Sequence, residues 1–185
     1  MKVEKGNPGY IRSRKKLDLI CLLLFVVLGI AIFLSGYYIT RTRANIFTVL
    51  AVLMVLPGAK RAVALFVMLP RRSVDRERYE KIKNEVGDGT LYCEYVFTST
   101  EKIMHLDFLL VKNGNVLGVI APSRQDIDYL KKYLPESVNK ISDHYHVKLF
   151  DNDEEFLGQV KRLSQTEADE ERDKALLEFL YASMV

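Results

Sequence analysis

The sequence predicts a hairpin of two membrane helices followed by one soluble α/β domain. Residues 19–39 form an uninterrupted apolar run of twenty-one residues without a charge. Residues 44–69 are mostly apolar and carry no charge apart from Lys60 and Arg61. A helix of about 20 apolar residues crosses the ~30 Å hydrocarbon core of a bilayer. From Ser73 onward, short apolar segments with helical or alternating periodicity replace these runs, which is typical of a soluble domain.

The length of 185 residues leaves room for this hairpin and for one soluble domain of about 115 residues. We therefore expect a basic cytoplasmic tail over residues 1–16, two membrane helices with an interfacial segment over 17–70, and a cytoplasmic α/β domain over 73–185. Residues 1–86 contain 16 Lys and Arg against 6 Asp and Glu, whereas residues 87–185 contain 11 against 18. This asymmetry is typical of a chain that lies against a negatively charged membrane surface.

The positive charges also predict the orientation in the membrane. Six Lys or Arg precede the first apolar run, only Arg41 and Arg43 lie between the two runs, and eight lie between Lys60 and Lys83. Because positive charge favours the cytoplasmic side, both termini are predicted to be cytoplasmic in a multi-pass protein of the cell membrane. The first run is too long for a signal peptide and lacks a small-x-small cleavage site, so we expect an uncleaved signal anchor.

Six cations are expected to form a membrane-surface cluster that binds the anionic inner leaflet. They are Lys60, Arg61, Arg71, Arg72, Arg76 and Arg78. A nucleic-acid role is not favoured, because Tyr79 is the only nearby aromatic side chain on which a base could stack.

The second apolar run has two interpretations. Lys60 and Arg61 favour a span from Ala44 to Ala59 followed by an interfacial helix from Ala62 to Leu69. The alternative is one kinked helix from Ala44 to Leu69, which would place the basic pair inside the membrane. Ala31 and Ser35 are spaced to form a small-residue face against which the second helix could pack.

The soluble part is predicted to begin with a helix and three strands. Ser73 can cap a helix whose apolar stripe is Tyr79, Ile82 and Val86 and which ends at Gly87. Strands are predicted over residues 90–98, 103–112 and 116–121. The dipeptide Asn113-Gly114 separates the last two strands and indicates a hairpin with a type I′ turn.

The rest of the domain is predicted to be helix, strand, helix and helix. Ser123 with Asp126 indicates a helix start, and Pro135 indicates a break or bend in that helix. A strand is expected over residues 145–150, and the last helix is expected to open at Thr166 with Asp169. The predicted inward positions of the three helices are Ile127, Leu130 and Leu134, then Phe156, Val160 and Leu163, then Ala175, Leu176, Phe179 and Leu180.

The order α-β-β-β-α-β-α-α, together with the segment HLDFLLVKNGNVLGVIAPS at residues 105–123, resembles the nuclease-related (NERD-type) domains of the PD-(D/E)XK, restriction-endonuclease-like superfamily. In that family an Asp on the second strand and an E-x-K motif on the third hold a divalent metal for phosphodiester cleavage. Asp107 falls on the Asp position. The resemblance therefore implies a restriction-endonuclease-like fold around residues 75–150.

The chain departs from this family at the E-x-K motif, where it has Ala121-Pro122-Ser123. The loss of the carboxylate and the ammonium group removes a metal ligand and a group that orients water. We therefore expect a degenerate, non-enzymatic domain without a metal or other cofactor, which binds a protein partner or serves in assembly. A membrane-tethered nuclease with a migrated site at Asp107, Glu94 and Glu80 is one alternative. A sensor of a small ligand or lipid is another.

The remaining candidate residues have simple interpretations. Cys21 and Cys93 lie in different parts of the chain and are not expected to form a disulfide, which fits a reducing compartment for the domain. Cys93 alternates with Leu91, Tyr95 and Phe97, which places the four on one face, and Cys93 is expected in the core rather than as a nucleophile. His105 and Asp107 are expected to form the polar edge of a half-buried strand, with metal or phosphate binding as the alternative. His144 and His146 are expected to be solvated.

Overall fold

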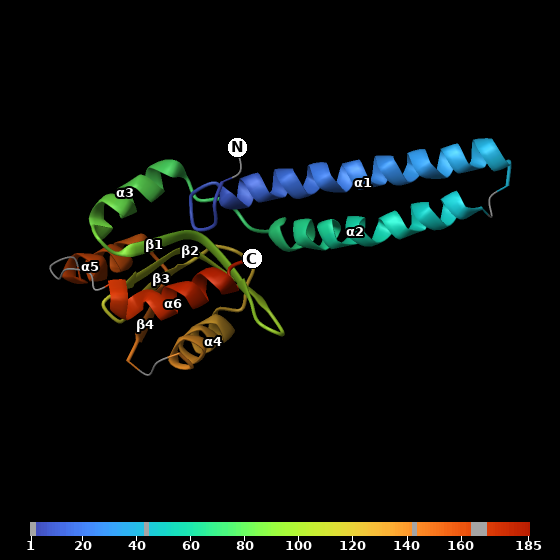
Figure 1. The fold of residues 1–185 in the computed structure, drawn as a ribbon. Helices are drawn as coiled ribbons and strands as arrows, with labels where there is room; N and C mark the ends of the chain where they lie inside the picture. Colours follow the sequence, from blue (N-terminus) through green and yellow to red (C-terminus); the bar gives the residue numbers. More distant parts are fainter. Residues whose placement is uncertain (1–2, 43–44, 142–143, 164–169) are drawn as a thin grey trace. The chain divides into compact units, whose positions relative to one another are not determined.

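The computed structural model describes residues 3–42, 45–141, 144–163 and 170–185. It divides into two compact units, residues 12–70 and residues 1–11 together with 71–185. Two long apolar helices precede a mixed four-stranded sheet with helices, which confirms the predicted class at this level (Figure 1). The predicted opening of the last helix at Thr166 and Asp169 lies outside the described residues.

The first unit contains α1 (Tyr10–Thr40) from Arg12 onward and α2 (Ile46–Met68). Each helix is long and apolar enough to cross a bilayer, which fits a membrane protein. The second run is one continuous helix with Pro57 inside it, so the predicted division into two helices at Lys60 and Arg61 is wrong. Arg61 does not end the helix because its Nη1 lies 3.2 Å from Oδ1 of Asp18, a fully buried carboxylate on α1.

The two apolar helices pack through glycines. A Cβ on Gly36 would lie 2.3 Å from Cβ of Phe47, so only glycine permits this approach. Gly29 faces Ala51 and Met54 across the same contact. Ala31 and Ser35 are exposed, so the predicted small-residue face was placed on the wrong side of the helix.

The sheet of the second unit has the strand order β1-β2-β3-β4. Its strands are β1 (Thr90–Thr98), β2 (Ile103–Lys112), β3 (Asn115–Ile120) and β4 (His146–Phe150). The first three strands are antiparallel, and β4 lies parallel to β3 after a helical crossover. Lys112 pairs with Asn115 across the two-residue turn, in which Asn113 (φ 49°) and Gly114 (φ 74°) are both left-handed. The predicted type I′ hairpin is confirmed.

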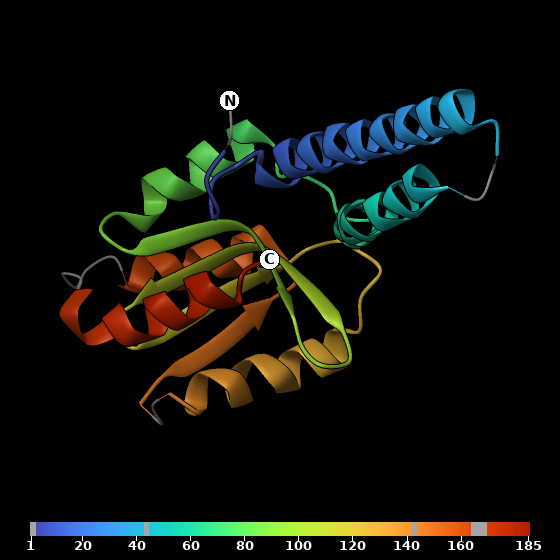
Figure 2. The same ribbon diagram turned by 45° about the vertical axis from the view of Figure 1, so that its right-hand side comes forward.

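Helices cover both faces of the sheet (Figures 1 and 2). On one face lie α3 (Arg76–Val86) and α5 (Asp153–Leu163), and on the other lie α4 (Ile127–Asn139) and α6 (Glu170–Ser183). The predicted inward residues of α3 are all buried. Both faces of the central strands therefore carry apolar residues, and the strands are apolar almost throughout.

Several helix details differ from the prediction. The N-cap of α4 is Asp126, whose carboxylate accepts from Tyr129 N at 2.9 Å, and Pro135 lies inside the helix without ending it. Ile127 and Phe179 point outward, and Ala175 is exposed. On α6 the buried apolar residues are Leu176, Leu180 and Met184 just beyond its end, at a spacing of four.

Candidate functional site

A polar pocket of about 160 Å³ lies on the α3 and α5 side of the sheet. Its wall comes from the segment before α3, from α3 itself, from β2 and from the end of β3. The lining residues are Arg72, Ser73, Val74, Asp75, Arg78, His105, Asp107, Ala121, Pro122 and Ser123. The pocket thus brings Asp107 together with Ala121-Pro122-Ser123, the residues at the expected Asp and E-x-K positions.

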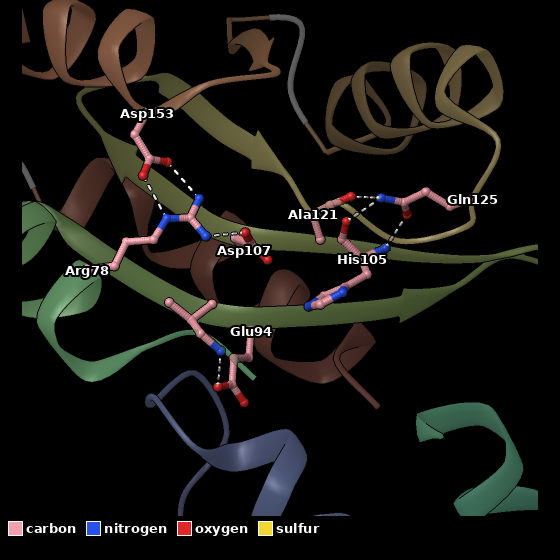
Figure 3. A network of polar contacts seen from close by, with 8 residues as sticks. Arg78, Glu94, His105, Asp107, Ala121, Gln125 and Asp153 are labelled. Carbon is pink, nitrogen blue, oxygen red and sulfur yellow. Dashed lines mark hydrogen bonds and ion pairs between the residues drawn. The ribbon is translucent and has the colours of Figure 1, made fainter. Parts of the chain in front are cut away.

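Arg78 holds the two acidic side chains at this site (Figure 3). Its Nε and Nη2 each lie 2.6 Å from one carboxylate oxygen of Asp153, the first residue of α5, and its Nη1 donates to Oδ2 of Asp107. The guanidinium also lies over the ring of Phe108, 5.1 Å from the ring centroid. Hydrogen bonding to Asp153 is the main cause that raises the pKa of Arg78 above its ordinary value. Arg78 is therefore a fixed cation that joins α3, α5 and β2.

Asp107 is a buried carboxylate at an irregular point of the sheet. Its side chain is 5% exposed, and the pairing of β2 with β3 shifts register between Leu106 and Phe108. Burial raises the pKa of Asp107, while the bond and charge of Arg78 act in the opposite direction. Because Arg78 already neutralises this carboxylate, a metal at Asp107 would have to displace that ion pair.

His105 is buried beside the pocket and its backbone is bound by the side chain of Gln125 (Figure 3). Gln125 Oε1 accepts from His105 N at 2.8 Å, and Nε2 donates to His105 O at 2.8 Å and to Ala121 O at 3.0 Å. This amide continues the hydrogen bonding of β3 beyond its last residue. The expectation that His105 and Asp107 form the polar edge of a half-buried strand is wrong, because both residues are buried and β2 is buried along almost its whole length.

The other two carboxylates of the migrated nuclease site lie elsewhere. Glu80 is exposed, and its Oε1 lies 3.9 Å from Nε of Arg76. Glu94 is fully buried but does not line the pocket. Among the described residues, no three His, Cys, Asp or Glu side chains are grouped so that they could hold a metal ion. The structure therefore does not gather Asp107, Glu94 and Glu80 into one site.

Glu94 is bound by residues at the start of α1 and by residues of the segment before α3. Its Oε1 accepts from Gly9 N at 2.8 Å, from Val74 N at 2.9 Å and from the hydroxyl of Ser73. Its Oε2 accepts from Ile11 N at 2.6 Å. Ser73 was predicted as the cap of α3, but its hydroxyl binds Glu94 instead, and α3 begins after Asp75.

The six cations of the predicted membrane-surface cluster differ in their surroundings. Arg61 pairs with Asp18, Arg78 with Asp107 and Asp153, and Arg71 is buried and donates to Ile103 O at 3.3 Å. Lys60, Arg72 and Arg76 are exposed. Arg61, Arg71 and Arg78 are thus held by protein groups, whereas Arg76 makes only a long ion pair of 3.9 Å with Glu80 at the surface.

The remaining candidates are as expected. Cys93 is fully buried, and burial raises the pKa of its thiol well above the ordinary range. His144 and His146 are exposed.

Sequence reasoning missed Arg78, Asp153 and Gln125 as parts of this site. Asp153 lies about 75 residues from Arg78 in the chain, and no local pattern links the two. Gly6 and Gly9, both left-handed at φ 83° and 85°, were the available signal that the basic tail has a defined conformation.

Comparisons with protein-family models, with curated proteins and with solved structures give no match. The interpretation of the site therefore depends on its geometry alone.

Proposed function

We propose that this chain is a membrane-anchored, non-enzymatic protein whose cytoplasmic α/β domain binds a protein partner or serves in assembly. We further propose that the domain is a catalytically degenerate member of the restriction-endonuclease-like fold, related to the NERD-type domains. The order of the described elements, α3-β1-β2-β3-α4-β4-α5-α6, is compatible with that topology.

The observation that carries the proposal is the state of Asp107. A metal-dependent nuclease needs carboxylate oxygens free to bind a divalent cation. Asp107 is instead tied to Arg78, and its neighbours at the pocket are Ala121, Pro122 and Ser123. A site of this kind can position a polar group of a partner, but it lacks the ligands that would activate water.

The two-unit division supports the proposed orientation. Residues 1–11 and 71–185 belong to one compact unit, while the two apolar helices lie between them in the sequence. A unit formed from both ends requires that the chain return to the side on which it began. Two membrane crossings satisfy this condition, and the positive-inside bias favours the cytoplasm as that side.

The test of the non-enzymatic assignment uses the full chain in detergent micelles, incubated with single-stranded and double-stranded DNA and with RNA in Mg²⁺ or Mn²⁺. We expect no cleavage above that of an Asp107→Ala variant purified in parallel. Cleavage that the wild type performs and Asp107→Ala does not would overturn the proposal in favour of a tethered nuclease.

The pocket favours a second candidate, a sensor of a small polar ligand or lipid headgroup. A volume of about 160 Å³ is below the ~300–1,000 Å³ of drug-sized ligand sites, so the ligand would be small. Thermal-shift screening of the full chain with small anions and short-chain lipids tests this candidate. A stabilisation that is lost in a Ser123→Phe variant, which fills the pocket, would favour the sensor over the assembly protein.

A further inference from the structure

Residues 3–11 form a strap on the edge of β1. Cys93 N donates to Gly6 O at 2.8 Å, and the Tyr10 hydroxyl donates to Val185 O at 3.0 Å. Tyr10 and Ile11 are buried. A Cβ on Gly6 would lie 2.8 Å from the ring of Tyr92, so the strap packs closely on the strand. The strap is therefore part of the folded domain, although a short basic segment at this position was expected to be a tail.

The centre of the strap contact is Glu94, which has an unusual backbone conformation. Glu94 has φ 55°, a left-handed value that is unfavourable for a residue with a side chain. In regular β1 it would fall opposite Asp107, because Cys93 pairs with Phe108 and Tyr95 pairs with Leu106. Two carboxylates placed directly opposite each other repel. The left-handed conformation turns Glu94 away from Asp107 and toward the four donors of the strap and of residues 73–74.

The same carboxylate is connected to the wall of the polar pocket. Ser73 and Val74 both donate to Glu94, and both line the pocket. Gly9 N binds the same carboxylate oxygen as these two donors, Ile11 N binds the other oxygen, and neither residue lines the pocket. If the strap leaves, Glu94 loses the bonds from Gly9 and Ile11, two of the four that hold its carboxylate. The bonds to Ser73 and Val74 then become the only ones described that hold it.

We propose that Glu94 is a latch that couples docking of the strap, residues 3–11, to the shape of the polar pocket. The docked state has all four bonds to Glu94 and a closed wall at Ser73 and Val74. Undocking of the strap frees Glu94 to leave the left-handed conformation and opens that wall. Such coupling is reciprocal. Undocking of the strap must therefore alter the shape of the pocket, and a change in the shape of the pocket must alter the stability of the docked strap.

The test perturbs the strap at Gly9, where a Cβ would have nothing within 4 Å but the backbone is left-handed. Gly9→Ala therefore strains the strap without filling space in the pocket. Gly158→Ala is the matched control, since Gly158 also has open space but lies within helix α5. Two readouts are followed in the full chain in detergent micelles. Hydrogen exchange reports on residues 3–11, and thiol labelling of Ser123→Cys, in a Cys21→Ser background, reports on the pocket.

For Gly9→Ala we expect exchange of the strap and labelling of the cysteine at position 123 to rise together, each by about tenfold, with no change for Gly158→Ala. Glu94→Gly, which suits the left-handed backbone but removes the carboxylate, should give the same result, and the exposed Glu80→Gln should not. Faster strap exchange with unchanged labelling overturns the coupling. Unchanged hydrogen exchange of the strap in both Gly9→Ala and Glu94→Gly overturns the latch. An equal rise in hydrogen exchange over β2 also overturns it, because such a rise would mean general unfolding.

Discussion

At the scale of single residues, Glu94 and Asp107 determine which side chains of β1 and β2 face which helices. Before Glu94, Leu91 and Cys93 pack toward α3 and α5, whereas after it Tyr95 and Phe97 pack toward α4 and α6. β2 changes face in the same way at Asp107. Leu106 packs toward α4 and α6, whereas Phe108 packs toward α3 and α5. An extra or left-handed residue shifts the alternation of a strand in this way.

This change of face within β1 and β2 explains why the side-chain directions at the site were not predicted correctly from the sequence. A strict alternation placed Cys93, Tyr95 and Phe97 on one face, and the structure divides them between two. No short pattern in an apolar strand reveals a left-handed Glu. The local conformation of Glu94 depends on donors from residues 9, 11, 73 and 74, so it could not be predicted from the strand alone.

The ion pair of Arg78 gives the first prediction at this scale. Arg78→Met should destabilise the full chain by about 2–4 kcal/mol, because it leaves the carboxylate of Asp107 buried without its cation. Arg76→Met is the control and should cost little, since Arg76 is exposed and its ion pair with Glu80 is long. Denaturation in detergent micelles measures both. Equal losses in the two variants would contradict the assignment of Arg78.

The loss in Arg78→Met should also depend on pH. Burial raises the pKa of Asp107, and Arg78 is the group that lowers it. Without Arg78 the folded state binds the proton more tightly than the unfolded state does, so stability falls as pH rises from the ordinary Asp pKa through the raised value. The destabilisation should therefore be larger at about pH 7.5 than at about pH 5. A loss that is independent of pH would mean that Asp107 is not the group left unpaired.

Cys93 provides a second prediction for a single residue. Burial raises the pKa of its thiol, and the thiolate is the reactive form. In a Cys21→Ser background we expect no modification of the native chain by N-ethylmaleimide and complete modification in denaturant. Rapid modification of the native chain would show that this part of β1 opens.

At the scale of elements, the hairpin between β2 and β3 was predicted because its signal is local. Asn113-Gly114 provides two residues that tolerate left-handed backbone, and the apolar runs on each side fix the register. The stripe of α3 was predicted for the same reason. The single helix α2 was only the alternative interpretation, because the ion pair between Asp18 and Arg61 joins residues 43 positions apart.

Gly114→Val tests the hairpin. Gly114 has φ 74°, which a β-branched residue adopts only with strain, so we expect a loss of about 1–3 kcal/mol in the free energy of unfolding. Gly114→Asn is the control at the same position, because Asn tolerates this conformation. Its loss should be clearly smaller. If valine is tolerated as well as asparagine, the turn does not have the conformation described.

At the scale of the whole molecule, the division into two units gives a prediction about topology. With Cys21 replaced by Ser, a cysteine at Thr42 in the link between α1 and α2 should react with a membrane-impermeant reagent in intact cells. A cysteine at Glu154, an exposed position of α5, should react only after permeabilisation. Both expectations follow from charge bias and from the single unit formed by residues 1–11 and 71–185. Labelling of Glu154→Cys in intact cells would refute the orientation.

The strap also constrains how the protein is made. Residues 3–11 leave the ribosome before either apolar helix, but their partners at Ser73, Val74 and Glu94 are synthesised only after both helices. During this interval the first residues have no binding partner on β1 and must remain on the side of the membrane where the sheet later folds. The strap can dock only after Ser73, Val74 and Glu94 have been synthesised, so a bulky fusion placed directly before Val3 should delay folding more than one placed in the link between α1 and α2.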